Sequence, residues 1–221
     1  MIALALEAKA DLVELDYHHS SDGVPIVIHD GTFDRTTNSR SIFKRKNIRA
    51  ASLLAVEIDQ LDAGRWYGPQ FAGTRVPTLH EALAVITSNG TILIERKDGD
   101  AHTLAAIFAE EKNTSNIVVQ SFDWKFLAEL NQIAPNIDII ALGNGPISLD
   151  VVADVQSIGA KGINWNHLDI NLDGLKIAHQ NQMTVWAYTV NDASRIADLN
   201  GMGVDGIVTN EITKVRAIVN Y

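Results

Sequence analysis

Short runs of β-type residues alternate with helical segments along most of the chain. The β-type runs cover residues 11–19, 24–29, 91–96, 117–122, 137–143, 161–165, 183–190 and 205–210. Between the later runs lie helical stretches at 101–112, 124–133, 149–158, 171–181 and 192–201. Strand–helix repetition at this spacing predicts right-handed βαβ units and therefore a parallel sheet.

The number of runs indicates a barrel that is one strand short. The run at 24–29 follows its predecessor across a tight turn at Asp22 and Gly23, so we expect these two to pair as a hairpin, which leaves seven strands. A (β/α)8 barrel has eight strands in about 250 residues. This chain has 221 residues and opens with a helical segment, MIALALEA, that leads directly into a strand. We therefore predict one α/β domain over residues 1–221, a (β/α)8 TIM-type barrel with the first strand missing.

A polar, turn-rich stretch at about 30–80 breaks the alternation. We interpret it as a small insertion after the second barrel strand, packed over one end of the barrel. Its aromatic residues, such as Trp66 and Tyr67, either line a substrate entrance or form the hydrophobic core of the insertion. The second interpretation is favoured, because a small insertion needs a core of its own.

Composition and charge narrow the function classes. The chain has no cysteine, so thiolate metal sites and cysteine nucleophiles are excluded. The formal net charge is −9, so the chain lacks the positive charge that binds a nucleic-acid backbone. No apolar run approaches the roughly 18 residues that span a bilayer. The first residues lack the basic region of a signal peptide. We expect no nucleic-acid partner and no membrane span; a cytoplasmic location is the default, since an export signal would lie upstream of Met1.

The first strand carries candidate chemistry on one face. Side chains two residues apart share a face of a strand, so Glu14, Asp16 and His18 point into the barrel. Leu15 and Tyr17 then face the helices. Barrel active sites lie at the carboxyl ends of the strands, and a buried carboxylate pair needs a positive partner. From this strand alone, a salt-bridged polar plug is an equal alternative.

The strand at 91–96 repeats the pattern. Glu95 and Lys97 point inward, and Arg96 faces the helix layer, from which it should snorkel outward. Three inward carboxylates, Glu14, Asp16 and Glu95, favour a hard divalent cation with oxygen ligands, Mg²⁺ or Ca²⁺, over Zn²⁺.

His29 ends the hairpin strand close in sequence to this acidic cluster. A lone histidine is more often a surface or capping residue than a catalytic one. Its position at a strand end beside the carboxylates makes it a candidate for proton transfer.

Several segments together resemble the glycerophosphodiester phosphodiesterase family. They are VELDYHHSSDGVPIVIHDGTFDRTTN, LDAGRWYGPQFAGTRVPTLHEAL, LIERK, VVQSF, VWAYTVND and GVDGIVTN, in this order and spacing. The resemblance implies a (β/α)8 barrel with an insertion after the second strand and metal-dependent hydrolysis of glycerophosphodiesters to an alcohol and glycerol phosphate. It also implies metal ligands at Glu14, Asp16 and Glu95, a phosphate-facing lysine at Lys97, one of two catalytic histidines at His29, and Tyr188 in place of a tryptophan near the leaving group.

The chain departs from the family pattern at its start. The family's His-Arg-Gly motif, which carries the other catalytic histidine and a phosphate-binding arginine, is not among these residues, nor is the Pro-Glu-Asn-Thr segment that follows it. We therefore expect the chain as given to be severely impaired in hydrolysis. Lys9 also stands where a glycine usually ends the helix, at a cost of about 1 kcal/mol if its backbone is left-handed.

Two alternatives to an active hydrolase remain at the level of sequence. One is a non-catalytic barrel remnant that binds a phosphate or a partner. The other is an aldolase- or isomerase-type barrel, which the GVDGIVTNE segment supports only weakly. The expected partner is a small phosphodiester; the sequence leaves open which alcohol is released, whether the cation is Ca²⁺ or Mg²⁺, and the oligomeric state.

Overall fold

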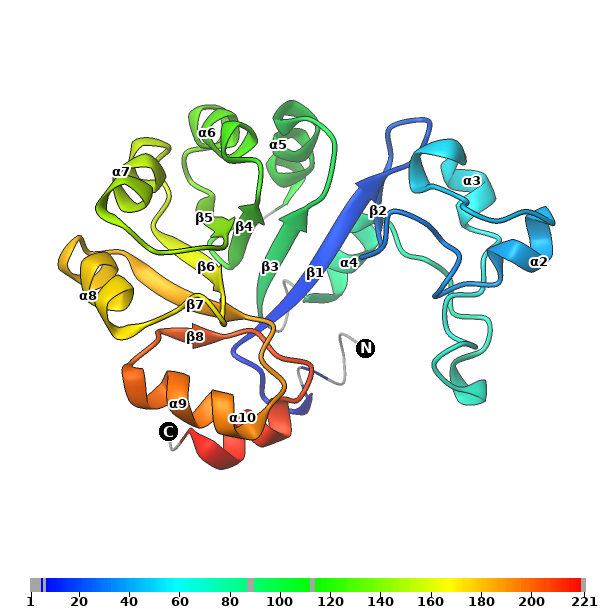
Figure 1. The fold of residues 1–221 in the computed structure, drawn as a ribbon. Helices are drawn as coiled ribbons and strands as arrows, with labels where there is room; N and C mark the ends of the chain where they lie inside the picture. The colour runs from blue at the N-terminus through cyan, green and yellow to red at the C-terminus, as the bar shows by residue number, and fades with distance from the viewer. Residues whose placement is uncertain (1–4, 6, 87–89, 112–113, 220–221) are drawn as a thin grey trace.

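A single curved sheet organises the chain (Figure 1). The structure is a computed structural model that describes residues 5, 7–86, 90–111 and 114–219. The strands of the sheet are β1 (Leu12–His19), β2 (Pro25–Val27), β3 (Thr91–Arg96), β4 (Ile117–Ser121), β5 (Asp138–Gly143), β6 (Gly162–Asn166), β7 (Thr184–Tyr188) and β8 (Gly206–Ile207). Their order is β2-β1-β3-β4-β5-β6-β7-β8, with β2 antiparallel to β1 and every other pair parallel. The predicted hairpin and parallel sheet are confirmed.

Helices follow the parallel strands and cover the outside of the sheet (Figure 1). They are α4 (Leu79–Ile86), α5 (Ala101–Glu110), α6 (Trp124–Ile133), α7 (Leu149–Ser157), α8 (Leu172–Gln180), α9 (Ala193–Met202) and α10 (Ile212–Ile218). Each of α5 to α9 begins where a polar side chain accepts a hydrogen bond from a main-chain N–H in the first turn. These caps are Asp100, Asp123, Ser148, Asn171 and Asp192. The five helices predicted between strands are thus confirmed, and local capping explains where they start.

The side of the sheet that meets the helices holds the main hydrophobic core. Leu15 and Tyr17 of β1 and Ile92 and Ile94 of β3 are buried in one cluster with apolar residues of the helices. The predicted division of β1 and β3 into two faces is therefore correct. Within the part of the chain that the structure describes, the ladder ends at β8 and does not return to β1.

Residues 30–80 form a separate lobe beside β1 and β2 (Figure 1). Its short helices are α2 (Ser39–Phe43), η1 (Ala50–Ser52), α3 (Ala55–Ile58) and η2 (Pro69–Phe71). A second buried cluster fills it: Ile26, Ile28, Phe33, Ile48, Ala50, Leu53, Ile58, Leu61 and Val76. Trp66 and Tyr67 lie outside this cluster and are exposed. The insertion has its own core, and that core extends onto β2.

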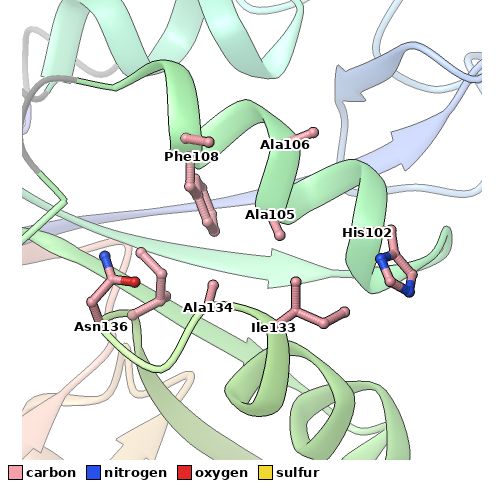
Figure 2. A pocket seen from close by; sticks show the side chains of 9 residues that line it. His102, Ala105, Ala106, Phe108, Ile133, Ala134 and Asn136 are labelled. Carbon is pink, nitrogen blue, oxygen red and sulfur yellow. The ribbon is translucent and has the colours of Figure 1, made fainter.

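A surface groove of about 340 Å³ lies between α5 and α6 (Figure 2). His102 stands at one end and Asn136 at the other, with Phe108 and alanine side chains between them. It contains none of the predicted site residues. Among the described residues, no helix combines the length and the apolar character needed to cross a membrane.

The start of the chain contacts its last helix. Arg216 of α10 donates a hydrogen bond to the carbonyl of Lys9 and lies 3.3 Å from Asp11. Lys9 has φ 60°, and the N–H of Ala10 donates to the carbonyl of Ala5 at 3.0 Å, which is the hydrogen bonding of a left-handed helix end. The helix predicted at 1–8 lies mostly outside the described residues.

The left-handed backbone at Lys9 yields a stability prediction. Replacing Lys9 by glycine should stabilise the fold by about 1 kcal/mol, because glycine adopts this conformation without a Cβ clash and the carbonyl that Arg216 binds is kept. The measurement is the urea midpoint. Lys176→Gly, on the exposed side of α8, is the control and should destabilise by about 1 kcal/mol. A Lys9→Gly midpoint at or below that of the parent chain would contradict the backbone argument.

Candidate active site

The register of β1 against β3 brings the three predicted carboxylates together. Asp16 pairs with Glu95 across the two strands, and Glu14 precedes Asp16 on the same face. One ligand oxygen from each of Glu14, Asp16 and Glu95 lies within 4.8 Å of the others. The side chains of Asp16 and Glu95 are only 11% and 10% exposed. The cluster could hold a metal ion, and its donors are all carboxylate oxygens, which suit a hard cation.

Lys97 supplies the positive charge that this cluster needs. Its ammonium lies 2.9 Å from Oδ1 of Asp16 and donates to Oε1 of Glu95. Burial alone would lower the pKa of Lys97, but the hydrogen bonds to Glu95 and Asp16 outweigh burial and raise this pKa above its usual value. Lys97 is therefore a permanent cation bound to two of the three carboxylates.

Glu14 lacks such a partner. Burial, followed by the charges of Asp16 and Glu95, raises the pKa of Glu14 to about 8. Lys97 and a 3.4 Å hydrogen bond from the side-chain amide of Gln120 offset only part of this effect. Burial and Asp16 also raise the pKa of Glu95, against the opposing effect of Lys97. Three carboxylates face one ammonium, so the cluster favours a bound proton or a further cation, as a divalent metal site does.

Gln120 belongs to a hydrogen-bonded network on the inner face of the sheet. Asn164 of β6 donates from its side-chain amide to Oε1 of Gln120 on β4 at 2.8 Å, and Gln120 in turn reaches Glu14. Both amides are buried, and Oδ1 of Asn164 has no hydrogen-bond partner among the described residues. The network links Glu14 of β1 to β4 and β6.

His29 follows the end of β2 at the edge of the cluster. Its side chain is 69% exposed, and Nδ1 lies 2.9 Å from Oδ1 of Asp30. Two hydrogen bonds from Arg35, at 2.6 and 2.8 Å, hold Asp30 and lower its pKa. The N–H of Ile28 donates to the carbonyl of Asp16 at 3.0 Å, which ties the segment of His29 to the carboxylate strand. The ring is thus oriented through Nδ1, and most of the side chain is open to solvent.

Tyr188 ends β7 on the same side of the sheet. Its hydroxyl donates to the carbonyl of Gly143 at 3.0 Å, and its ring meets Phe122 edge to face with centroids 6.0 Å apart. Burial and then the charge of Glu95 raise the pKa of Tyr188, which places the phenol within electrostatic reach of the cluster. Phe122 is 52% exposed. The two rings form an apolar wall beside the carboxylates.

Comparison with known proteins agrees with this geometry. The sequence profile of the glycerophosphoryl diester phosphodiesterase family matches residues 1–214. The chain belongs to this family. A Bacillus subtilis relative, YhdW, is 33% identical over 215 residues, a match that covers 94% of this chain and 85% of YhdW.

Solved structures show the same fold. A glycerophosphodiester phosphodiesterase from Agrobacterium tumefaciens superposes with a TM-score of 0.80 at 27% identity, covering 98% of this chain and 90% of that one. An Oleispira antarctica phosphodiesterase, solved with the product sn-glycerol-3-phosphate, gives a TM-score of 0.89 at 21% identity and covers 98% and 88%. The predicted (β/α)8 barrel class is confirmed.

Arg96 differs from the prediction made from strand alternation. It does not snorkel into solvent: its side chain is 16% exposed, pairs with Asp123 at 2.9 Å, donates to the carbonyl of Gly99 and lies over the ring of Phe126. The ion pair forms because Asp123, the N-cap of α6 after the neighbouring strand β4, lies beside the end of β3. The guanidinium is therefore a structural link between two βα units.

Three polar residues and one helix near the site were not predicted from the sequence. Gln120 and Asn164 occupy inward positions of β4 and β6, and the two-residue period applied to these strands would have found them. Asp98, which lies just beyond Lys97 and binds His18, gave no periodic signal. The start of helix α4 has a signal in the sequence: Thr78 and Glu81 form a capping box.

The raised pKa of Glu14 makes stability depend on pH. In the folded chain Glu14 keeps its proton up to about pH 8, whereas its ordinary pKa is 4.5. Its stabilising contribution is therefore complete below pH 4.5 and is lost as the pH rises toward 8. In chelator, the unfolding temperature should fall between pH 5 and 8, and Glu14→Gln should remove much of that fall.

The control for this experiment is Glu110→Gln at the exposed end of α5, which should keep the parent slope. At pH 8, Ca²⁺ or Mg²⁺ should raise the unfolding temperature of the parent chain and have less effect on Glu14→Gln. Equal pH slopes in Glu14→Gln and Glu110→Gln would show that Glu14 is not the group responsible.

Proposed function

We propose that this chain hydrolyses glycerophosphodiesters to an alcohol and glycerol phosphate in a reaction that depends on a divalent cation. The carboxylate cluster around Lys97 is the observation that supports this proposal, because it combines a cation site with a fixed positive charge. A Bacillus subtilis relative named glycerophosphodiester phosphodiesterase, 28% identical over 228 residues, agrees with it. The proposed site lies where β1 pairs with β3, with Asp16 opposite Glu95.

In this proposal Glu14, Asp16 and Glu95 hold the cation, either Ca²⁺ or Mg²⁺. Their oxygens are hard donors within 4.8 Å of one another. Burial, followed by the charges of Asp16 and Glu95, raises the pKa of Glu14, and a bound cation would oppose this effect. A bound divalent cation supplies Lewis-acid polarisation of phosphoryl oxygens. Gln120 orients Glu14 through their hydrogen bond.

Lys97 is proposed to bind the phosphate. Its ammonium has three donors, of which Asp16 and Glu95 take two, so one remains for a phosphoryl oxygen. A positive charge fixed beside the reacting group stabilises the charge that develops as water attacks phosphorus.

His29 is proposed to move a proton. With Nδ1 held by Asp30, Nε2 can exchange a proton with the attacking water or with the oxygen of the departing alcohol. Hydrolysis forms one P–O bond to water and breaks the P–O bond to the alcohol, which leaves with a proton. The 221 residues contain one of the two histidines that the family resemblance implies, and no His-Arg-Gly motif. We therefore propose slow turnover for this polypeptide.

The test is release of alcohol from glycerophosphocholine with and without chelator. Turnover should disappear in chelator and return with Ca²⁺ or Mg²⁺. In Asp16→Asn and Glu95→Gln, Ca²⁺ or Mg²⁺ should no longer restore turnover. His29→Ala should lower kcat by about 10²- to 10⁴-fold. Glu110→Gln serves as the control. Binding of cation and of sn-glycerol-3-phosphate with no turnover under any condition would favour the non-catalytic binding protein instead.

Tyr188 is proposed to contact the alcohol part of the substrate through its ring. Because its hydroxyl is bound to the carbonyl of Gly143, Tyr188→Phe should change KM less than about threefold. Tyr188→Ala removes the partner of Phe122 and should raise KM about tenfold or more. A Tyr188→Phe variant as impaired as Tyr188→Ala would show that the hydroxyl, and not the ring, carries the effect.

A further inference from the structure

We propose that His18, anchored by Asp98, is a positioning residue that holds the main chain of His29 beside the carboxylate cluster. The inference rests on the proposed function, in which His29 moves a proton. It assigns a role to two residues, His18 and Asp98, that neither bind the cation nor face the phosphate in that proposal. The contact between the His18 ring and the carbonyl of His29 is the observation that carries it.

Asp98 fixes His18 from the loop that follows β3. Its Oδ2 lies 2.6 Å from Nδ1 of His18, and its Oδ1 accepts the main-chain N–H of His19 at 2.7 Å. Burial would raise the pKa of Asp98, but the hydrogen bonds from His18 and His19 outweigh it and lower this pKa, so Asp98 is a carboxylate. Two neighbouring residues of β1 are thus held by one charged acceptor.

The loop that carries Asp98 is itself tightly placed. Gly99 has φ 90°, and its Cα lies so close to the ring of His19 that a Cβ would come within 1.8 Å of it. The carbonyl of Gly99 accepts from Arg96 at 2.9 Å. Because the loop is fixed from two sides, Asp98 is a rigid anchor for the imidazole of His18.

The other ring nitrogen of His18 points to the proposed proton-transfer residue. Nε2 lies 3.4 Å from the carbonyl oxygen of His29, and the His18 side chain is only 13% exposed. Both neighbours of the ring, the Asp98 carboxylate and this carbonyl, are acceptors, so each contact is a hydrogen bond when its ring nitrogen carries a proton. The ring therefore bridges the end of β3 and the segment after β2.

This bridge supplements a main-chain contact on the other side of His29. The N–H of Ile28 donates to the carbonyl of Asp16, so the residue before His29 is held by β1. His18 holds the carbonyl of His29 itself. Loss of the bridge leaves the main chain at His29 held only through Ile28, besides the contact of the ring with Asp30. Small displacements of a catalytic group cost large factors in rate.

Two substitutions separate the two ends of the bridge. His18→Asn places an amide N–H near the position of Nδ1, so it keeps the bond to Asp98 and loses the bond to His29. His18→Gln places an amide N–H near the position of Nε2 and does the reverse. We expect His18→Asn to lower kcat about 10- to 100-fold with KM within about twofold of the parent. We expect His18→Gln to remain within about threefold of the parent in both.

A second measurement does not depend on turnover. Amide hydrogen exchange in residues 28–31 should be about tenfold faster in His18→Asn than in the parent chain and near the parent rate in His18→Gln. His80→Asn, on the exposed side of α4, is the matched control and should change neither exchange nor kcat.

The outcomes are distinguishable from failure of the proposed function. Equal exchange rates and equal kcat in His18→Asn and His18→Gln would overturn the positioning role, because the two variants differ in which bond they keep. If the parent chain released no alcohol with Ca²⁺ or Mg²⁺, the proposed function would fail, and the exchange comparison would still decide whether His18 holds the segment of His29.

Discussion

The repulsion among three buried carboxylates is the constraint on which the rest of the site depends. The parallel register places Asp16 beside Glu95, and Glu14 lies two residues earlier on the same face of β1. The pairing of β1 with β3 therefore brings these three acidic side chains together. Lys97 pairs with two of them, and Glu14 keeps only a long hydrogen bond from Gln120. The fold therefore contains a position where a proton or a cation would relieve the repulsion, so the cluster could hold a metal ion.

The two-residue period of β1 and β3 couples this acidic interior to the hydrophobic core. The same alternation that buries Leu15 and Tyr17 against the helices turns the carboxylates inward, so a shift of register by one residue would expose the core and disperse the cluster at once. Arg96 is the exception to this alternation, because it is a charged side chain on the face that packs against the helices. Its ion pair with Asp123 offsets the free energy of placing that charge there.

Most of the fold and the central carboxylates could be predicted from the sequence, because both follow from local periodicity. Strand alternation placed Glu14, Asp16 and Glu95 on one face before any geometry was known, and the helices after β3 begin at capping side chains visible in the sequence. The partners of Gln120 and Arg96 could not be predicted, since they lie on strands and loops distant in the sequence and depend on the curvature of the whole sheet. The contact of His18 with Asp98 could not be predicted for the same reason, because it depends on the conformation of the loop that follows β3.

The two halves of the site belong to two different hydrophobic clusters. The carboxylates and Lys97 stand on strands packed against the barrel helices, whereas the side chain of Ile28, next to His29, is buried in the core of the insertion with Phe33. The core of the insertion therefore helps to place His29, the proposed proton-transfer residue, relative to the carboxylate cluster. The pairing of β1 with β2 joins the two parts, and the bond from Ile28 to Asp16 and the bridge through His18 add to it. These contacts cross between separately packed cores, so they help to set the position of His29 relative to the carboxylates.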